Sequence, residues 1–301
     1  MKSRTWIAAI ILVAVIFGSI SAQMFFDRDE HTESFSPRHV ISKLDPEIVK
    51  PSISYDAALD MLQKVGYSPP GDCNANLIND HGWNKTYWEI SWEGLVCVKV
   101  DAATGEMIGM SDHRDVRNEV PCETVSEGNA ATIALENMKR ITDVPDGLDE
   151  PDVRTDDDGH FVLLWKQYID SVPVRGGFVN AELDRCGNLV SFRKVWHDVN
   201  VDVSPRIADE EAMDIARAEG LNLPDVLKKR VANADNVYAE LVIGRPSSPL
   251  DRDKPIYGDY TLLWSVTFED VQMTLKGPVT SAVAIQVDAH SGEVVGMDYT
   301  K

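Results

Sequence analysis

The chain repeats one eleven-residue phrase. VDAATGEMIGM at residues 100–110 recurs as VDAHSGEVVGM at residues 287–297, and seven of the eleven positions are identical. Such a near-duplicate indicates an internal repeat, in which one scaffold has been copied and has diverged. We therefore expect the chain to fold from recurring elements. A copied scaffold that carries no catalytic signature also favours a binding module over an enzyme.

The repeated phrase has the composition of a turn. Its aspartate ends a strand-like stretch, where the carboxylate can accept hydrogen bonds from amides ahead of it, and its first glycine can adopt the positive φ of a short hairpin. The segment DRCG at residues 184–187 offers the same pair in the middle of the chain. The sequence thus predicts three structural turns, built on Asp101 and Gly105, on Asp184 and Gly187, and on Asp288 and Gly292.

Similar elements precede each turn. Apolar residues at helical spacing predict helices over residues 55–65, 127–141 and 210–219. Alternation of period two predicts antiparallel strands, and the tryptophans in them are expected to be core residues. These strands cover residues 88–92, 96–100, 161–169, 174–183, 189–196, 264–268 and 283–287. The last two are separated by eleven more residues than the first two, so residues 269–280 are expected to form a longer connecting loop.

These elements follow one order, which consists of a helix, then a strand with the pattern W-x-[VI]-x-[FW], then the phrase V-x-V-D-A-x-[TS]-G-E. This order resembles that of the PepSY domain family. The resemblance covers residues 55–110 and 208–297, and residues 163–192 are similar to a related repeat. It implies an α+β fold of tandem PepSY-like units, each a helix packed on a small antiparallel β-sheet, with boundaries at 53–122, 123–200 (divergent) and 201–301. PepSY domains occur in propeptides of thermolysin-like proteases and in exported proteins without a protease. The resemblance therefore implies binding or restraint of a peptidase or a cell-envelope partner, and it transfers no catalytic residue.

The N-terminal residues indicate export. Within residues 1–26, Lys2 and Arg4 precede an uncharged, mostly apolar run from Thr5 to Ala22, which is compatible with a cleaved signal peptide or a retained membrane anchor. Either alternative leaves the protein secreted or anchored to the outer face of the cytoplasmic membrane. Residues 27–52 are polar and contain three prolines, so they are expected to be a linker.

Charge and motif content exclude several functions. Forty-nine acidic and 29 basic residues give a net charge of −20, which would repel nucleic acid. The acidic run from Asp146 to Asp158 lacks the order of a calcium loop and is expected to be a solvated loop. Seven scattered histidines show no metal-ligand spacing, so neither a metal nor a cofactor is expected. The common nucleophile-elbow, P-loop and dinucleotide fingerprints are missing from the sequence.

Four cysteines suit an oxidising exterior. Three of them fall early in the exported part, which favours one bridge among Cys73, Cys97 and Cys122 and leaves Cys186, in a predicted turn, free. Asn84 begins an N-x-T sequon and is a candidate glycosylation site.

The leading functional hypothesis is an exported, non-enzymatic protein that binds a peptidase or other envelope partner. The alternative is a structural or adhesive surface protein whose repeats act as a spacer, and the third reading is an unrecognised extracellular hydrolase. For the partner contact we favour an unpaired sheet edge and the long connecting loop. The candidate residues of that loop are Glu269, Asp270, Met273 and Leu275.

Overall fold

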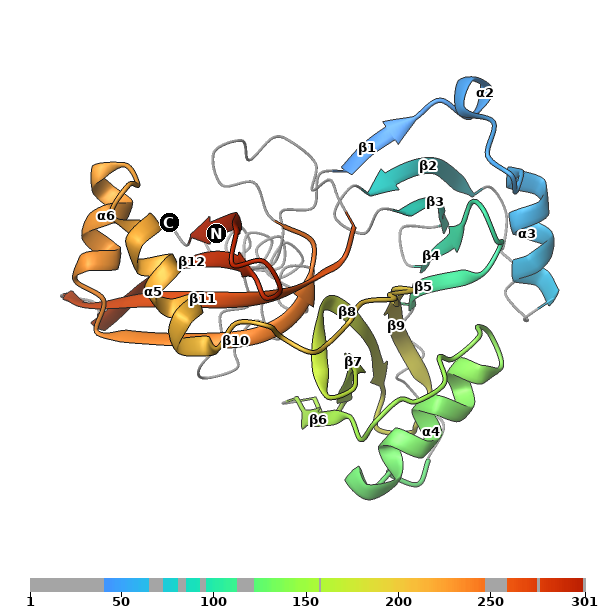
Figure 1. Ribbon diagram of the computed structural model, residues 1–301. Helices are drawn as coiled ribbons and strands as arrows, with labels where there is room; N and C mark the ends of the chain where they lie inside the picture. The colour runs from blue at the N-terminus through green and yellow to red at the C-terminus, as the bar shows by residue number, and fades with distance from the viewer. Residues whose placement is uncertain are drawn as a thin grey trace, which may run out of the picture. The chain divides into compact units, whose positions relative to one another are not determined.

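Strands dominate the architecture (Figure 1), and their pairings connect them in one sheet. The computed structural model describes residues 41–64, 73–80, 85–92, 96–112, 122–156, 158–246, 259–274 and 277–299. All of these belong to one of the two units into which contacts divide the chain, Pro37–Lys301. The expected signal peptide or anchor lies outside the described residues. Among the described helices, none has the length and apolar character needed to cross a membrane.

The sheet has 13 strands. Its main path runs through β1 (Ile41–Leu44), β2 (Asn74–Asp80), β3 (Lys85–Trp92), β4 (Val96–Asp101), β5 (Met107–Asp112), β9 (Leu189–Val195), β8 (Val172–Leu183), β10 (Asn236–Gly244), β11 (Thr261–Thr274), β12 (Gly277–Asp288) and β13 (Val294–Tyr299). Off this path, β7 (Phe161–Ile169) pairs with β8, and β6 (Asp152–Thr155) pairs with β7. The pairings are antiparallel except that of β8 with β10, which is parallel and rests on Val174 opposite Ile243.

The expected fold class is wrong: the strands do not form tandem units that each carry a helix on a separate small antiparallel sheet. Instead one mixed sheet continues across the whole described region. The strand of the first signature phrase, β5, pairs with β9 of the middle segment, with Gly109 opposite Arg193, and β8 pairs with β10 of the last segment. The physical reason is that the edge of a small sheet exposes unpaired backbone groups, which joining of edges satisfies. The boundaries at residues 122 and 200 stay predictions.

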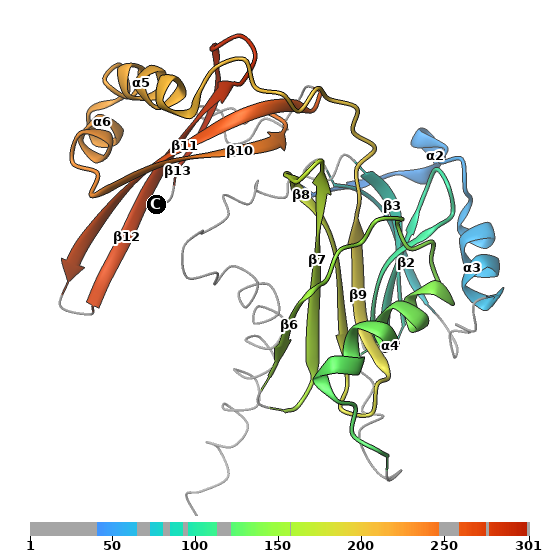
Figure 2. The ribbon, with the colours of Figure 1, turned by 60° about the horizontal axis from the view of Figure 1, so that its bottom comes forward.

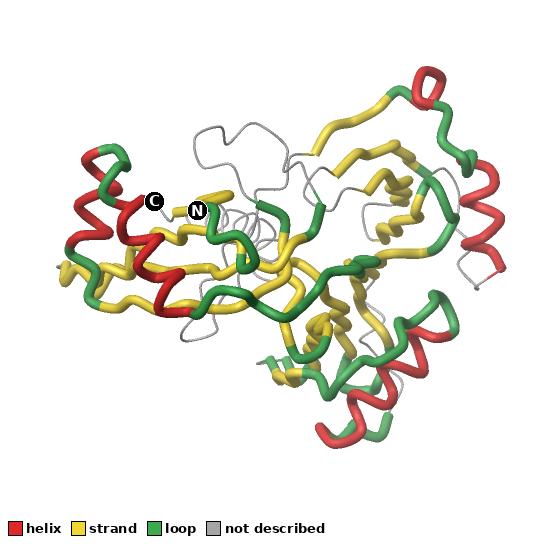
Figure 3. The backbone as a smooth tube through the Cα atoms, in the orientation of Figure 1, coloured by secondary structure: helices red, strands yellow, loops and turns green. Residues whose placement is uncertain are grey.

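Helices lie against the sheet at three places. Figure 3 shows them in red against the yellow strands. The three expected helices are α3 (Tyr55–Lys64), α4 (Glu127–Lys139) and α5 (Asp209–Gly220), while α2 (Pro46–Val49) and α6 (Asp225–Ala232) were not predicted. In Figure 2, α4 lies over β7, β8 and β9, while α5 and α6 lie over the sheet of the last segment, where α6 contacts β11 and β12.

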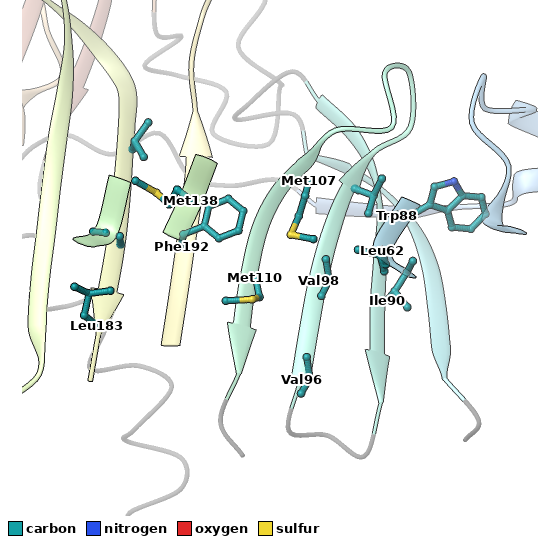
Figure 4. Packing of buried hydrophobic residues seen from close by; sticks show 14 of the residues in the cluster. Leu62, Trp88, Ile90, Val96, Val98, Met107, Met110, Met138, Leu183 and Phe192 are labelled. Carbon is teal, nitrogen blue, oxygen red and sulfur yellow. The ribbon is translucent and has the colours of Figure 1, made fainter. Parts of the chain in front are cut away.

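Two of the four hydrophobic clusters in the described residues lie beneath the helices. One core joins Ala58 and Leu62 of α3 with Ala134 and Met138 of α4 through the strands between them (Figure 4). The first and middle segments thus share a single core, which is a second departure from separate units. The other core lies between α5, α6 and β11–β13 and contains Val266 and similar apolar residues. Burial of Trp88, Trp92 and Trp165 in the first core confirms their prediction as core residues.

Part of the segment expected to be a linker is folded. β1 pairs antiparallel with β2, from Ile41 opposite Asp80 to Leu44 opposite Leu77. The short helix α2 follows, and the Asp45 carboxylate accepts a hydrogen bond from the amide of Glu47 at its start (3.0 Å). A polar strand such as β1 gives little alternation for the sequence to reveal, because it lies at the edge of the sheet.

Candidate functional site

The three signature turns share an aspartate that accepts backbone hydrogen bonds and a glycine of positive φ, and the middle turn is one residue shorter than the others. The Asp101 carboxylate accepts hydrogen bonds from the amides two and three residues ahead (2.8 and 3.1 Å), and the Asp288 carboxylate does the same (3.0 and 2.7 Å). In the middle turn, the Asp184 carboxylate accepts from amides two and four residues ahead (2.8 and 2.9 Å). The glycines Gly105, Gly187 and Gly292 have φ values of 78°, 84° and 75°.

The carboxylates of Asp101 and Asp288 are already engaged in hydrogen bonds within the protein. Burial opposes ionisation of Asp101, but the hydrogen bond from Lys85 (2.9 Å) and those from the turn amides outweigh it and hold the pKa of Asp101 below its usual value. The pKa of Asp288 is lowered in the same way: burial raises it, and the hydrogen bonds from the backbone and hydroxyl of Ser291 prevail. The aspartates therefore stabilise turns and have little capacity left for a ligand.

The disulfide differs from the prediction. Cys122 is bonded to Cys186, so the expected bridge among Cys73, Cys97 and Cys122 is wrong and Cys186 is not free. The middle turn explains the pairing, because the amide of Val125 donates to the carbonyl of Arg185 (3.0 Å) and brings the two segments together. The spacing of cysteines in a sequence does not determine which of them pair, so this bridge could not be predicted from it.

Two thiols are free, Cys73 and Cys97. Cys73 Sγ lies 2.6 Å from the hydroxyl oxygen of Tyr55. Burial, followed by the nearby Glu89 carboxylate, raises the pKa of Cys97 to about 11. Cys97 is therefore a protonated, weakly nucleophilic thiol at neutral pH. The candidate glycosylation site Asn84 lies outside the described residues.

The expected long loop at residues 269–280 is wrong, because β11 and β12 continue through it as a hairpin. They pair from Leu263 opposite Asp288 to Thr274 opposite Gly277. Glu269, Asp270 and Met273 lie in β11, and Leu275 lies outside the described residues. A run rich in Val and Thr favours a strand over a loop once a partner strand is present.

Residues 271–274 and 277–281 form what we call the hairpin arm. Within the residues that the structure describes, β10 pairs with β11 as far as Glu269, and β13 pairs with β12 from Val283 onward. The arm therefore extends beyond both neighbouring strands, as Figure 2 shows. Its base is fixed, because Glu269 accepts a hydrogen bond from the Tyr238 hydroxyl (2.9 Å) and the amide of Val271 donates to the Asp235 carboxylate (2.9 Å).

A cavity of about 490 Å³ lies where the middle segment meets the last one. Its lining comes from the start of β3, residues 196–201 after β9, the end of β10 and the residues just before β11. The Arg245 guanidinium lies over the Tyr260 ring, 4.7 Å from its centroid, and the His197 ring lies 4.9 Å from that ring. Lys85, Asp198 and Asp259 also line the cavity.

Two hydrogen bonds with the Gln167 side chain hold the backbone of His197 in place. Its amide donates to Gln167 Oε1 (3.0 Å), and Gln167 Nε2 donates to its carbonyl (2.7 Å). Burial lowers the pKa of His197 to about 4, and the positive charges of Arg245 and Lys85 add to the shift. The imidazole is therefore neutral at neutral pH.

The cavity offers hydrogen-bond donors to an anionic group. The buried Nε atom of Arg245 has no hydrogen-bond partner among the described residues, although a guanidinium group pairs readily with a carboxylate in two-point geometry. Lys85, whose ammonium group already pairs with Asp101 (2.9 Å), also lines the cavity, and the exposed Asp198 and Asp259 add negative charge. No motif predicted this site, because its residues come from four separate stretches of the chain.

Comparison with known proteins yields little. No protein-family model matches the chain, and no curated protein matches it. Among solved structures, the chain is similar to the Bacillus megaterium YpeB C-terminal domain, with 13% sequence identity, coverage of 83% of this chain and 98% of that chain, and a TM-score of 0.39. A likeness of this size assigns no function.

Proposed function

We propose that the chain is an exported, non-enzymatic, PepSY-related protein that binds a peptidase or another cell-envelope protein through the hairpin arm. One observation supports this proposal above the rest: β11 and β12 continue beyond the pairing of β10 and β13. An extended segment of a partner can add to such an arm as a further strand, with main-chain hydrogen bonds providing affinity.

The rigid base of the arm supports the same function. The hydrogen bonds of Glu269 and Val271 hold the arm to β10 and to the residue before it. A strand that is already ordered loses little conformational entropy when it binds. A disordered loop at the same place would lose much more.

The repeated polar residues support a non-enzymatic role. Asp101, Asp184 and Asp288 each accept at least two hydrogen bonds within their own turns. The most recurrent feature of the sequence thus serves the fold. The proposal accordingly places function in main-chain recognition by a sheet edge.

The test is site-specific photocrosslinking in the native envelope. A photoreactive amino acid replaces Val271 in the arm, which is 38% exposed, and in the control it replaces Val226 on α6, which is 67% exposed. We expect one defined protein to crosslink from Val271 and not from Val226. A captured peptidase should also change its rate when the purified chain is added.

A shortened arm completes the design. Asp270 lies opposite Ser281, so residues 271–280 can be replaced by Asn-Gly, which forms a two-residue hairpin turn. We expect this variant to fold and to lose the crosslinked partner in competition assays. Equal competition by the shortened chain contradicts the proposal, and capture of envelope matrix alone supports the spacer alternative.

The cavity favours a second function, the binding of a free peptide carboxylate. The unpartnered Nε of Arg245 is the specific observation behind it. Calorimetry with a tripeptide and with its C-terminally amidated form tests this directly, because only the carboxylate differs. We expect binding of the free form to weaken at least tenfold in Arg245→Gln. Equal affinity for the two peptides contradicts it.

A further inference from the structure

Three potential metal ligands converge beside the turn between β6 and β7. Asp156 follows β6, His160 precedes β7, and Glu182 lies on β8, which pairs with β7. His160 Nδ1 lies 2.9 Å from Glu182 Oε1 and 3.8 Å from Asp156 Oδ2. One ligand atom from each of the three residues lies within 4.8 Å of the others.

The turn positions Asp156 and His160. One oxygen of Asp156, Oδ1, accepts hydrogen bonds from the amides of Asp158 (3.0 Å) and His160 (2.8 Å). The amide of Asp156 donates to the carbonyl of His160 (3.0 Å), and Gly159 adopts a φ of 79° that closes the turn. This arrangement leaves Oδ2 of Asp156 on the side of the imidazole.

The two carboxylate oxygens of Glu182 also have different partners. Its Oε2 accepts a hydrogen bond from the Ser191 hydroxyl (3.2 Å), while Oε1 faces His160. Each carboxylate therefore has one oxygen held by the protein and the other directed toward one ring nitrogen. Outer hydrogen bonds of this kind fix the orientation of metal ligands in known sites.

The exposed fractions of the three side chains show that the cluster lies partly in contact with solvent. The His160 side chain is 9% exposed, Glu182 is 25% exposed and Asp156 is 40% exposed. An ion among them would contact protein on one side and water on the other. Two carboxylates and a neutral imidazole carry a charge of −2, which matches a divalent cation.

Two of the three ligand separations, those from the imidazole to each carboxylate, fit one ion. Zinc binds imidazole nitrogen and carboxylate oxygen at about 2.0–2.2 Å. Two such ligands are therefore about 3.0 Å apart at a right angle and about 3.4 Å apart in a tetrahedron. The distances from His160 Nδ1 to the two carboxylates, 2.9 and 3.8 Å, bracket these values.

We propose that Asp156, His160 and Glu182 form a binding site for a divalent transition-metal ion of the zinc class. The imidazole favours such ions over calcium and magnesium, which prefer oxygen ligands. The site is independent of the hairpin arm and of the cavity at His197. It uses one residue of the acidic run that the sequence predicts to be a solvated loop.

The test is calorimetric titration of the full chain with ZnCl₂ after EDTA treatment, together with the visible absorption of bound Co²⁺. We expect one strong equivalent of Zn²⁺ and a higher unfolding temperature in its presence, since a ligand that binds only the folded state stabilises it. His160→Ala, Asp156→Asn and Glu182→Gln should each lower the affinity at least tenfold. Glu182→Gln keeps the volume and the hydrogen-bonding oxygen, so it is expected to fold.

His290→Ala is the matched control, because His290 also follows a turn aspartate and has a single carboxylate near its Nε2, that of Asp202 at 3.9 Å. It should bind Zn²⁺ as the unaltered chain does. Weak binding by many sites, equal in all variants, would show nonspecific attraction to an acidic surface and would overturn the proposal. Loss of stability in His160→Ala without any response of the unaltered chain to Zn²⁺ would also overturn it, because the His160–Glu182 hydrogen bond would then be structural only.

Discussion

Trp88 and Trp264 occupy equivalent positions in the fold. Each indole Nε1 donates a hydrogen bond to the carbonyl of an isoleucine that precedes a helix, Ile53 at 2.8 Å and Ile207 at 3.1 Å. The amide of each isoleucine in turn donates to the alanine carbonyl of the repeated phrase (2.9 and 3.2 Å). The sequence repeat therefore corresponds to a repeated set of contacts that links a strand, a turn and the start of a helix.

We predict that Trp88→Phe and Trp264→Phe each lower the free energy of unfolding by about 1–2 kcal/mol, because each leaves an isoleucine carbonyl without its donor. Urea denaturation followed by circular dichroism measures the change. Trp92→Phe is the control, since Trp92 is 3% exposed and its Nε1 has no hydrogen-bond partner in the part of the chain that the structure describes. A cost for Trp92→Phe equal to the other two would show that ring volume, and not the hydrogen bond, determines the effect.

The local elements could be predicted from the sequence because short-range patterns specify them. The predicted helix at residues 55–65 corresponds to α3 at Tyr55–Lys64, and the one at 210–219 corresponds to α5 at Asp209–Gly220. The joining of strands could not be predicted, because the contact of β5 with β9 rests on residues about 84 positions apart, Gly109 and Arg193. Sequence periodicity reports which face of a strand is buried, and it carries no information on which edge pairs with which.

The candidate sites were missed for the same reason. His160 and Glu182 are 22 residues apart and meet only because β7 and β8 pair. The residues that line the cavity come from four separate stretches of the chain between Lys85 and Tyr260. The signal that could have raised suspicion was the position of His160 directly after the acidic run. A single histidine there gives no metal-ligand spacing, however.

Two glycines in helices should respond in opposite directions to alanine. A Cβ atom on Gly220, at the end of α5, would lie 2.5 Å from Cγ1 and 3.1 Å from Cγ2 of the buried Val231 on α6. Because a β-branched side chain cannot easily move aside, Gly220→Ala should destabilise the protein by about 1–3 kcal/mol. Gly128, in the first turn of α4, has no atom within 4 Å of the added Cβ.

Gly128→Ala should therefore stabilise the protein by about 0.5–1 kcal/mol, since alanine is the better helix former. Thermal unfolding of the two variants side by side measures both effects. A stabilised Gly220→Ala would show that α5 and α6 do not pack as closely as described.

Reduction of the disulfide should weaken the fold. The bridge between Cys122 and Cys186 spans 64 residues of sequence, and a loop of that length corresponds to about 4 kcal/mol in the chain-entropy account. Unfolding in urea with and without reductant measures the loss. A Cys73→Ser, Cys97→Ser double variant should show the same loss, because neither thiol belongs to the bridge. An unchanged midpoint after complete reduction would contradict the prediction.

The cavity histidine predicts a loss of stability in mild acid. The pKa of His197 is about 4 in the fold, because burial disfavours the charged imidazole, against 6.5 for an unperturbed histidine. A depressed pKa means that the unfolded chain binds a proton first as the pH falls. The stabilisation is therefore present above pH 6.5 and is lost progressively as the pH falls from about 6.5 to about 4.

Between pH 7.5 and pH 5 this linkage should remove about 2 kcal/mol from the free energy of unfolding. His197→Gln removes the titrating group, so the variant should lose less stability than the unaltered protein over that interval. Nuclear magnetic resonance gives the direct measurement, since the ring protons of His197 should titrate near pH 4 in the native state and near pH 6.5 in urea. A native midpoint near 6.5 would mean that the imidazole is solvated.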